Sequence, residues 1–347
     1  MQVLTKTAVA QKALAAATVK VYRHRSRYMV DLITVEPGPG SIRVSATNLE
    51  TFAAIDLPAS GEETWKVSVD ATMFRDAVKI SGDLTYTGES LIVGGMTLPA
   101  LEDMPELEWG PPEYAGTFHG DPAFLHRATS SDQGRPILTG VHIGVDGWFD
   151  GLEAVATDSY RLHHAHYGGE WYGDPVLAPR AWFAELKRIL GGDVTISRIT
   201  CNNVDWIQGQ SDAGIVSARV IDGTFPNWRN LIDGHEEHGS ITVDAKQFGA
   251  LVTAAGKIDK DKPVRLTVGD VLTVSSKSGE ATYSATMPIQ GQWHGYKDEP
   301  AIAFSPSYLA GTLPKTGEAT ILFDESALKP AIVKSELGMA LLMPVRL

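Results

Sequence analysis

The sequence predicts an α+β fold of three tandem domains, each containing two repeats of a helix followed by an antiparallel sheet. One observation is a short apolar helix pattern that recurs six times, at intervals of roughly 50 to 65 residues. A second is that short segments rich in Val, Ile, Thr and Tyr, bounded by turn residues, fill the intervals. The chain of 347 residues is also long enough for two or three domains.

Each predicted helix begins at a residue that can start a helix and continues with an apolar stripe. Asp70 is followed by Met73 and Phe74, and then by Ala77 and Val78 one turn later. This spacing places the apolar side chains on one face, and the Asp70 carboxylate can accept hydrogen bonds from free N–H groups of the first turn. Similar patterns begin at Asp121, Pro179, Asp244 and Ser305, and a weaker one begins at Thr5 and continues through Val9, Ala13 and Leu14.

Nine segments have the composition and flanking residues of β-strands. They are short, and Gly, Asp or Asn bounds them, which favours antiparallel pairing through tight turns. The segments cover residues 41–46, 91–93, 141–145, 194–199, 215–220, 264–268, 272–275, 281–287 and 320–323.

The six helix patterns pair into three larger repeats with a period of about 110 to 130 residues. Residues 44–50 (VSATNLE) resemble residues 154–160 (AVATDSY), which lie 110 positions further on. We therefore predict three domains at roughly 1–115, 116–236 and 237–347, with residues 235–238 (HEEH) in a linker.

Composition and charge restrict the classes of protein and of site. The net charge of −12 opposes nucleic-acid binding unless the basic residues gather on one face. The one cysteine, Cys201, excludes an internal disulfide framework and a cysteine metal site. Residues 1–17 lack a signal-peptide layout, and no apolar run approaches the roughly 20 residues that cross a bilayer. We therefore expect a cytoplasmic protein.

Four segments in a fixed order resemble a known family. They are residues 135–141 (RPILTGV), 155–162 (VATDSYRL), 221–228 (IDGTFPNW) and the C-terminal 343–347 (MPVRL). Together they resemble the bacterial DNA polymerase III beta subunit, the beta sliding clamp, and the resemblance extends along the whole chain. It implies a non-catalytic processivity factor whose three clamp domains form half of a ring. The partners it implies are encircled duplex DNA and a second copy, joined head to tail through domains I and III.

The resemblance also implies weak, sequence-independent contacts with DNA phosphates. A basic run with Arg23, Arg25 and Arg27 is expected to touch DNA, and Gln133 and Arg135 occupy a comparable loop in the second domain. The alternative for each residue is an ordinary solvated surface. Further expected contacts come from basic residues on the repeated helices, away from the apolar stripe: Lys6, Lys12, Arg75, Lys79, Arg127, Arg180, Lys187, Arg188 and Lys246.

A peptide-binding pocket between the second and third domains is a further implication of the resemblance. The replicative polymerase, the clamp loader and repair proteins would dock short peptides there, on an apolar floor with Arg161 and Arg346 as donors at the rim. The alternative is that the C-terminal residues complete an edge strand and that Asp158 only caps a turn. The implied pocket residues are Leu138, Thr157, Ser159, Tyr160, Arg161, Leu162, Pro226, Asn230, Leu231, Leu341, Leu342, Met343, Pro344, Val345 and Arg346.

Three departures from the family pattern affect this prediction. Ser159 and Tyr160 stand where the family usually has Gly-His, and Asn230 replaces a basic residue. The first domain also lacks the Pro-Ile-Leu stretch that follows the basic loop. A diverged, specialised or phage-type clamp therefore remains an alternative, as does a clamp-fold paralogue that no longer encircles DNA.

No catalytic, metal or cofactor site is expected. His163, His164 and His166 lie close together, as do His235 and His238, without a convincing full ligand set. The chain has no Gly-x-Ser-x-Gly elbow for a nucleophile and no phosphate-binding loop of the Gly-x-x-x-x-Gly-Lys-Ser/Thr type. An enzyme built on repeated α+β units is therefore a remote alternative.

Overall fold

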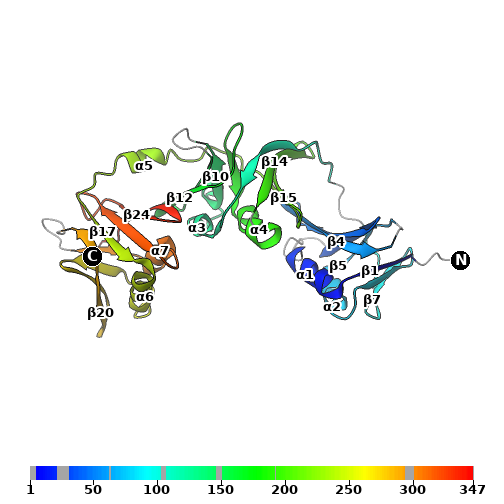
Figure 1. Ribbon diagram of the computed structural model, residues 1–347, viewed down its shortest axis with the longest axis horizontal. Helices are drawn as coiled ribbons and strands as arrows, with labels where there is room; N and C mark the ends of the chain where they lie inside the picture. Colours follow the sequence, from blue (N-terminus) through cyan, green and yellow to red (C-terminus); the bar gives the residue numbers. More distant parts are fainter. Residues whose placement is uncertain are drawn as a thin grey trace. The chain divides into compact units, whose positions relative to one another are not determined.

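The computed structural model describes residues 5–21, 31–61, 64–102, 107–145, 151–191, 193–293 and 301–346. The chain forms two compact units, which Figure 1 colours along the sequence. Both units contain helices and antiparallel sheets, so the predicted α+β class is confirmed. The predicted domain boundaries remain predictions. Unit 1 comprises Met1–Pro122, Gly168–Asp174 and Ala178–Val220, and unit 2 comprises Ala123–Tyr167, Pro175–Leu177 and Ile221–Leu347.

One order of elements, a strand, a helix and three strands, occurs six times along the chain. The helix-plus-sheet repeat is therefore confirmed, with a short strand added before each helix. The first repeat contains β1 (Thr5–Val9), α1 (Gln11–Val21), β2 (Leu32–Gly38), β3 (Ser41–Thr47) and β4 (Thr51–Ser60). The second contains β5 (Val67–Asp70), α2 (Ala71–Ala77), β6 (Asp83–Tyr86), β7 (Ser90–Val93) and β8 (Met96–Pro99).

The third and fourth repeats form the middle of the sequence. The third repeat contains β9 (Glu113–Phe118), α3 (Ala123–His126), β10 (Gly140–Gly144), β11 (Leu152–Thr157) and β12 (Arg161–Tyr167). In this third repeat a short 3-10 helix, η2 (Pro136–Thr139), lies between α3 and β10. The fourth contains β13 (Val176–Pro179), α4 (Arg180–Leu190), β14 (Val194–Cys201), β15 (Val204–Ser211) and β16 (Gly214–Arg219).

The fifth and sixth repeats follow a short helix, α5 (Arg229–Asp233), which the sequence patterns did not predict. All nine predicted strand segments overlap observed strands. The fifth repeat contains β17 (Gly239–Asp244), α6 (Ala245–Gly256), β18 (Val264–Val268), β19 (Val271–Ser278) and β20 (Ala281–Pro288), followed by β21 (Gln290–Gln292). The sixth contains β22 (Ala301–Phe304), α7 (Pro306–Thr312), β23 (Glu318–Phe323), β24 (Ala331–Ser335) and β25 (Gly338–Leu342).

One predicted helix start is wrong. Thr5 begins strand β1, which pairs with β4 and β6, and helix α1 begins at Gln11. Within β1, Thr7 and Val9 are buried while Lys6 is exposed, which is the alternation of a half-buried strand. The period of two in this segment therefore prevails over the weak helical spacing, and Lys6 lies on a strand.

The residues just before the helices differ in whether their side chains accept a hydrogen bond from the first turn. Asp70 caps α2, because its Oδ1 accepts the N–H of Met73 at 2.7 Å. Asp244 caps α6 in the same way, accepting the N–H of Gln247 at 2.7 Å. Ser305 makes no such bond before α7, where a proline occupies the first turn. Two of the predicted caps are therefore confirmed as hydrogen-bonding caps.

The repeats join through the third strand after each helix, here called the closing strand: β4, β8, β12, β16, β20 and β25. Unit 1 contains a 12-stranded sheet in which β4 pairs with β16, and unit 2 contains a nine-stranded sheet in which β12 pairs with β25. Each joint thus links the closing strand of an odd-numbered repeat to that of an even-numbered repeat. Among the described strands, the other two closing strands, β8 and β20, each pair with one neighbour, β7 and β19.

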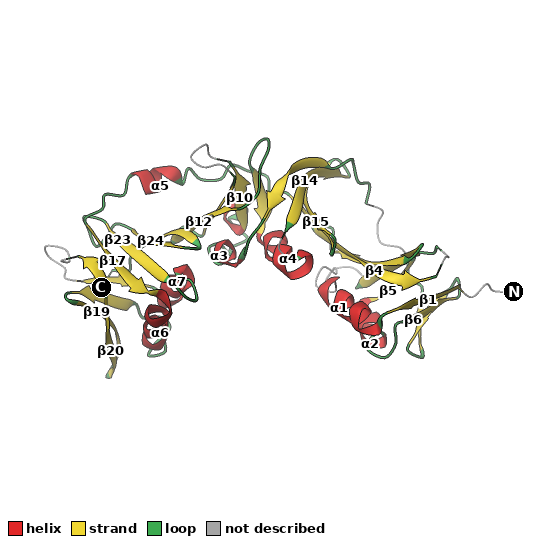
Figure 2. Ribbon diagram, viewed as in Figure 1, coloured by secondary structure: helices red, strands yellow, loops and turns green. Residues whose placement is uncertain are grey.

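Helices cover one face of the sheets and bury large side chains there (Figure 2). In unit 1, Leu14 of α1, Phe74 of α2 and Trp182 of α4 are fully buried. The Trp182 indole N–H donates to the carbonyl of Val216 at 3.0 Å, so this buried polar atom is satisfied. Cys201 lies in a separate apolar cluster with Ile199 and Trp206.

In unit 2, α6 and α7 pack side by side, and Phe248 and Leu309 are fully buried on them. None of the described helices is both long enough and apolar enough to cross a bilayer.

The predicted likeness between residues 44–50 and 154–160 extends to the hydrogen bonds of two turns. The hydroxyls of Thr47 and Thr157 each donate to the carbonyl four residues further on, at 2.7 and 2.8 Å. The side-chain oxygens of Asn48 and Asp158 each accept the N–H groups two and three residues further on, at 2.7 to 3.0 Å. The first and third repeats therefore share a turn as well as an element order.

Candidate functional site

The joint between β12 and β25 brings together two segments of the predicted peptide-binding site within unit 2. In this antiparallel pair, Leu162 lies opposite Leu341. Just beyond the strands, the N–H of Met343 donates to the carbonyl of Tyr160 at 2.9 Å. The N–H of Val345 then donates to the carbonyl of Ala303 at 2.7 Å, which holds the C-terminal segment beside β22.

An apolar cluster lies along this joint. It consists of the buried side chains of Val155, Leu162, Trp228 and Leu341, against which Phe225 and Ile232 pack, and is here called the floor cluster. The sequence motif contained Trp228 without assigning it a role. Apolar residues at positions 225, 228 and 232 have the spacing of a helical face, and this signal could have revealed that the segment before and through α5 covers the sheet.

Several predicted residues present apolar surface beside the floor cluster. Tyr160 is 58% exposed, Leu231 is 54% exposed and Met343 is 38% exposed. The Tyr160 ring lies 6.3 Å from that of Tyr308, measured between ring centroids. Pro226, Asn230, Val345 and Arg346 are exposed as well, and Thr157 and Pro344 are half-buried.

Leu138 and Leu342 belong to the interior. Leu342 is fully buried and lies opposite Arg161 in the strand pair, so its side chain is on the other face of the sheet from Leu341. Leu138 is buried in η2, and its carbonyl accepts the N–H of Ser130 at 2.8 Å. Both residues support the surface from below.

The Arg161 side chain is engaged within the protein and is only 14% exposed. Its Nε lies 3.0 Å from Asp158 Oδ2, and its guanidinium carbon lies 4.3 Å from the centre of the Tyr308 ring. The same Asp158 caps the turn, so the alternative role considered for this residue, a local turn cap, is observed. Arg161 thereby ties the β11–β12 turn to α7.

Ser159 adopts a left-handed backbone conformation, with φ of 79°. Glycine adopts this conformation without steric cost, which gives a physical reason for the glycine that the family usually carries there. The Ser159 hydroxyl accepts a hydrogen bond from Arg135 Nη1 at 3.1 Å. Arg135 also pairs with Asp132 at 3.1 Å, and Gln133 is exposed in the same loop.

Of the basic residues predicted to contact DNA, Arg127 and Lys246 are exposed, after α3 and on α6 respectively. Arg75 lies within α2 and Lys79 just after it, and their side-chain nitrogens lie 3.5 and 2.6 Å from the carboxylate of Asp76. The hydrogen bond from Lys79 lowers the pKa of Asp76, so this carboxylate stays ionised and offsets positive charge on the helix.

Arg188 has a structural position in unit 1. It forms an ion pair with Glu185 on α4, and its Nη2 donates to the carbonyl of Lys20 at 2.8 Å, which fastens α4 to the end of α1. Arg180, the first residue of α4, is half-buried. The predicted contacts Arg23, Arg25 and Arg27 and the side chain of Lys187 lie outside the described residues.

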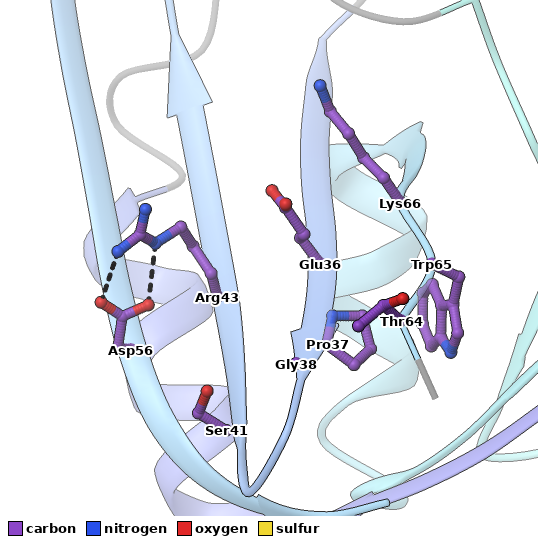
Figure 3. A pocket seen from close by; sticks show the side chains of 9 residues that line it. All are labelled: Glu36, Pro37, Gly38, Ser41, Arg43, Asp56, Thr64, Trp65 and Lys66. Atoms are coloured by element: carbon purple, nitrogen blue, oxygen red, sulfur yellow. Dashed lines mark hydrogen bonds and ion pairs between the residues drawn. The ribbon is translucent and has the colours of Figure 1, made fainter. Parts of the chain in front are cut away.

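A hollow of about 640 Å³ lies on unit 1, away from all of these predicted residues. Figure 3 shows Arg43 on β3 facing Asp56 on β4, with Glu36 on β2 and Trp65 and Lys66 along the other side. Arg43 donates a bidentate pair of hydrogen bonds to Asp56 at 2.8 Å, and this hydrogen bonding to the carboxylate raises the pKa of the Arg43 guanidinium. The lining therefore carries both signs of charge. Arg43 and Asp56 already bind each other, so their charges are balanced within the hollow.

The comparisons with known proteins agree on one family. Residues 125–227 match the family model of the DNA polymerase III beta subunit, central domain. Curated relatives named beta sliding clamp, from Synechococcus elongatus and Lactococcus lactis, are 28% identical over 242 residues and 29% identical over 210 residues. These matches cover 63% and 56% of this chain, and they span 61% and 53% of the relatives' own lengths.

Solved structures resemble the chain over its whole length. The beta sliding clamp of Caulobacter crescentus covers 100% of both chains with a TM-score of 0.81 at 22% identity. The DNA polymerase sliding clamp of Bacillus subtilis covers 99% of this chain and 100% of its own, with a TM-score of 0.81 at 20% identity. This likeness shows that the chain has the fold of these clamps.

Proposed function

We propose that the chain, which is similar to the bacterial DNA polymerase III beta subunit family, acts as a DNA sliding clamp. In this function the protein encircles duplex DNA and tethers a replicative polymerase, as a binding scaffold without a catalytic step. The observation that carries the proposal is the sixfold repeat joined through closing strands. A chain built from joints of one kind can make the same joint with a second copy.

The proposed dimer is head to tail through β8 and β20. Inside the chain, a closing strand of an odd-numbered repeat pairs with one of an even-numbered repeat, as in β4 with β16 and β12 with β25. The remaining closing strands are β8, of the second repeat, and β20, of the fifth. Pairing β20 of one chain with β8 of a second chain follows the same rule. In a closed dimer this pairing occurs twice, so that β8 and β20 of both chains are paired.

The proposed contact with DNA is weak and directed at phosphates. Exposed Arg127 and Lys246, and Lys12 on α1, support it. The ion pair of Lys79 with Asp76 counts against strong attraction, as does the net charge of −12. A ring does not need strong attraction, because encirclement holds it on DNA while weak contacts let it slide.

The proposed client site is the exposed apolar surface around the floor cluster. Tyr160, Leu231 and Met343 offer apolar side chains to the Leu and Phe anchors of a short peptide. Because Leu138, Leu162 and Leu341 are buried, we assign them to the support of this surface. Clients are the replicative polymerase, the clamp loader and repair proteins.

A specialised or phage-type clamp is the second candidate, favoured by Ser159, Tyr160 and Asn230. The Tyr160 ring occupies part of the surface where a client would dock. Asn230 cannot supply the positive charge that the family usually offers there to an acidic peptide group. Either change shifts client preference without altering the ring.

The test of the main proposal is retention on DNA of two topologies. The full chain, loaded onto nicked circular duplex with the clamp loader of its own host, is expected to co-elute with the circle in gel filtration. Linearising the circle should release it, and blocking both ends of the linear duplex with bulky proteins should restore retention.

Two outcomes would contradict encirclement. Equal retention on circular and unblocked linear DNA would indicate ordinary affinity for the duplex. Loss from circles as rapid as from open linear DNA would favour the paralogue that no longer surrounds DNA.

A further inference from the structure

Three potential metal ligands meet on one face of the sheet in unit 2. Among the described residues, one ligand atom from each of Glu153, His164 and His166 can be chosen so that all lie within 4.8 Å of one another. We propose that these three side chains bind a divalent transition-metal ion of the zinc class.

The strand geometry brings the ligands together. Glu153 on β11 lies directly opposite His166 on β12, so their side chains emerge side by side from one face. His164 is two residues before His166, which places it on that same face one step along the strand. The histidine cluster seen in the sequence lacked a carboxylate, because Glu153 becomes its neighbour only through strand pairing. His163 points to the opposite face and is excluded from the site.

The donor set matches zinc-class metals. Two imidazoles and one carboxylate bind Zn²⁺ in many sites that keep a fourth position for water, whereas Mg²⁺ and Ca²⁺ prefer oxygen ligands. Donors around a tetrahedral Zn²⁺ at about 2.0 to 2.1 Å stand about 3.4 Å apart. Small rotations of the side chains would reach this spacing from the arrangement observed.

The surroundings are partly organised for a metal. Glu153 and His164 are buried and hydrogen-bonded to each other, through Glu153 Oε1 and His164 Nε2. The other carboxylate oxygen lies 2.9 Å from Arg229 Nη2, which fixes the orientation of the carboxylate. The exposed His166 leaves one side open for the ion to enter.

The competing role for these side chains is an ion-pair network without a metal. The positive charge of Arg229 repels an incoming cation, and the Glu153–His164–Arg229 network is already a complete ion-pair arrangement without one. A second group, Glu236, His238 and Glu325, has similar spacing. All three of its side chains are exposed, so water competes for every ligand. His238 therefore supplies a matched control.

The experiment is equilibrium zinc binding to the full chain after metal is stripped from it. We expect one tightly bound Zn²⁺ per chain, and a Co²⁺-loaded sample should show the visible absorption of a four-coordinate site. His166→Ala changes an exposed residue, so folding should survive, and the affinity should fall at least about tenfold. His238→Ala should leave the affinity unchanged.

The opposite pattern would overturn the proposal. It would appear if His166→Ala kept the affinity of the unchanged chain, or if His238→Ala lost it. In that case zinc binds elsewhere. Absence of stoichiometric binding at micromolar zinc would assign the three residues to the ion-pair network alone. Circular dichroism of both variants verifies that each is folded.

Discussion

His163 shows how one buried side chain can make stability depend on pH. It is fully buried, and burial lowers its pKa to about 3 from the ordinary value of 6.5. Its Nδ1 lies 2.7 Å from the carbonyl of Phe124 and must donate there, which leaves Nε2 as the atom without a proton. The folded protein therefore holds the neutral imidazole.

This arrangement predicts a loss of stability in acid. Between pH 6.5 and 3 the unfolded chain binds a proton at His163 that the folded chain excludes, so the free energy of unfolding falls as the pH falls. From pH 7 to pH 5 the loss from this residue is about 2 kcal/mol. Urea unfolding at the two pH values measures it. His163→Leu should begin from a lower stability and show a smaller drop, and an unchanged drop would assign the effect to other groups.

Exposed apolar side chains around the floor cluster give a second prediction at this scale. Met343→Ala and Leu231→Ala should each weaken binding of a polymerase-derived peptide about tenfold, because each removes an apolar contact from an exposed surface. Fluorescence anisotropy with a labelled peptide measures the affinity. Leu328→Ala is the matched control, since Leu328 is 61% exposed and lies outside the proposed site. Equal effects of all three changes would refute the assignment.

The pattern of residues predicted only part of this site. Leu162, Leu341 and Met343 were identified by resemblance, and their meeting across a strand pair confirms that the two segments are neighbours. Engagement of Arg161 by Tyr308 could not be predicted, because it depends on packing between segments nearly 150 positions apart. The positive φ of Ser159 could not be predicted either, because serine rarely adopts this conformation, whereas a glycine at the same position would have suggested it.

At the scale of elements, the helix caps give a graded prediction. Asp70→Ala and Asp244→Ala should each lower the free energy of unfolding by about 1 kcal/mol, because each removes an acceptor for a first-turn N–H. Ser305→Ala should cost clearly less, since Ser305 does not cap α7 and its hydroxyl lies near that of Ser307. Urea midpoints of the three variants measure the order. A larger loss at Ser305 would contradict it.

The elements that the sequence predicted well have strong periodic patterns. The helices after Asp70 and Asp244 begin within one residue of the predicted cap. The short strands before the helices were missed, because four to six residues carry too few alternations to stand out. At Thr5 a strand with buried Thr7 and Val9 was mistaken for a helix for the same reason.

For the whole molecule, the free edge of β8 gives a prediction about assembly. The Gly94–Gly95 turn makes Val93 and Met96 the closing pair of a two-residue hairpin. Hydrogen-bonded pairs then alternate, so the Thr97 N–H points away from β7. Thr97→Pro should therefore remove an intermolecular hydrogen bond and shift the mass from dimer to monomer.

Light scattering during gel filtration measures that mass. Thr97→Val keeps the N–H and should remain a dimer, and Ser284→Pro on β20 should act as Thr97→Pro does, because the β19–β20 hairpin has the same two-residue geometry. A proline already stands at Pro99, two residues along the same edge, so β8 tolerates the ring. Dimers in both proline variants would place the interface elsewhere.

The sixfold repeat was the feature of the whole molecule best predicted from the sequence, because a pattern that is weak in one copy becomes significant when it recurs six times. Which closing strands pair could not be read from it. Each strand has a similar composition, and the choice between β16 and β25 as the neighbour of β4 depends on how complete repeats pack.

The burial of Cys201 makes selective labelling of the protein with fluorescent dyes practical. Its thiol is 2% exposed, and burial raises its pKa, so it is slow to form the thiolate that reacts with maleimides and disulfides. A cysteine introduced at an exposed position therefore reacts almost alone in the native chain. Dyes on cysteines that replace Thr97 and Thr286 would report, by energy transfer, separation and rejoining of β8 and β20 in the proposed dimer.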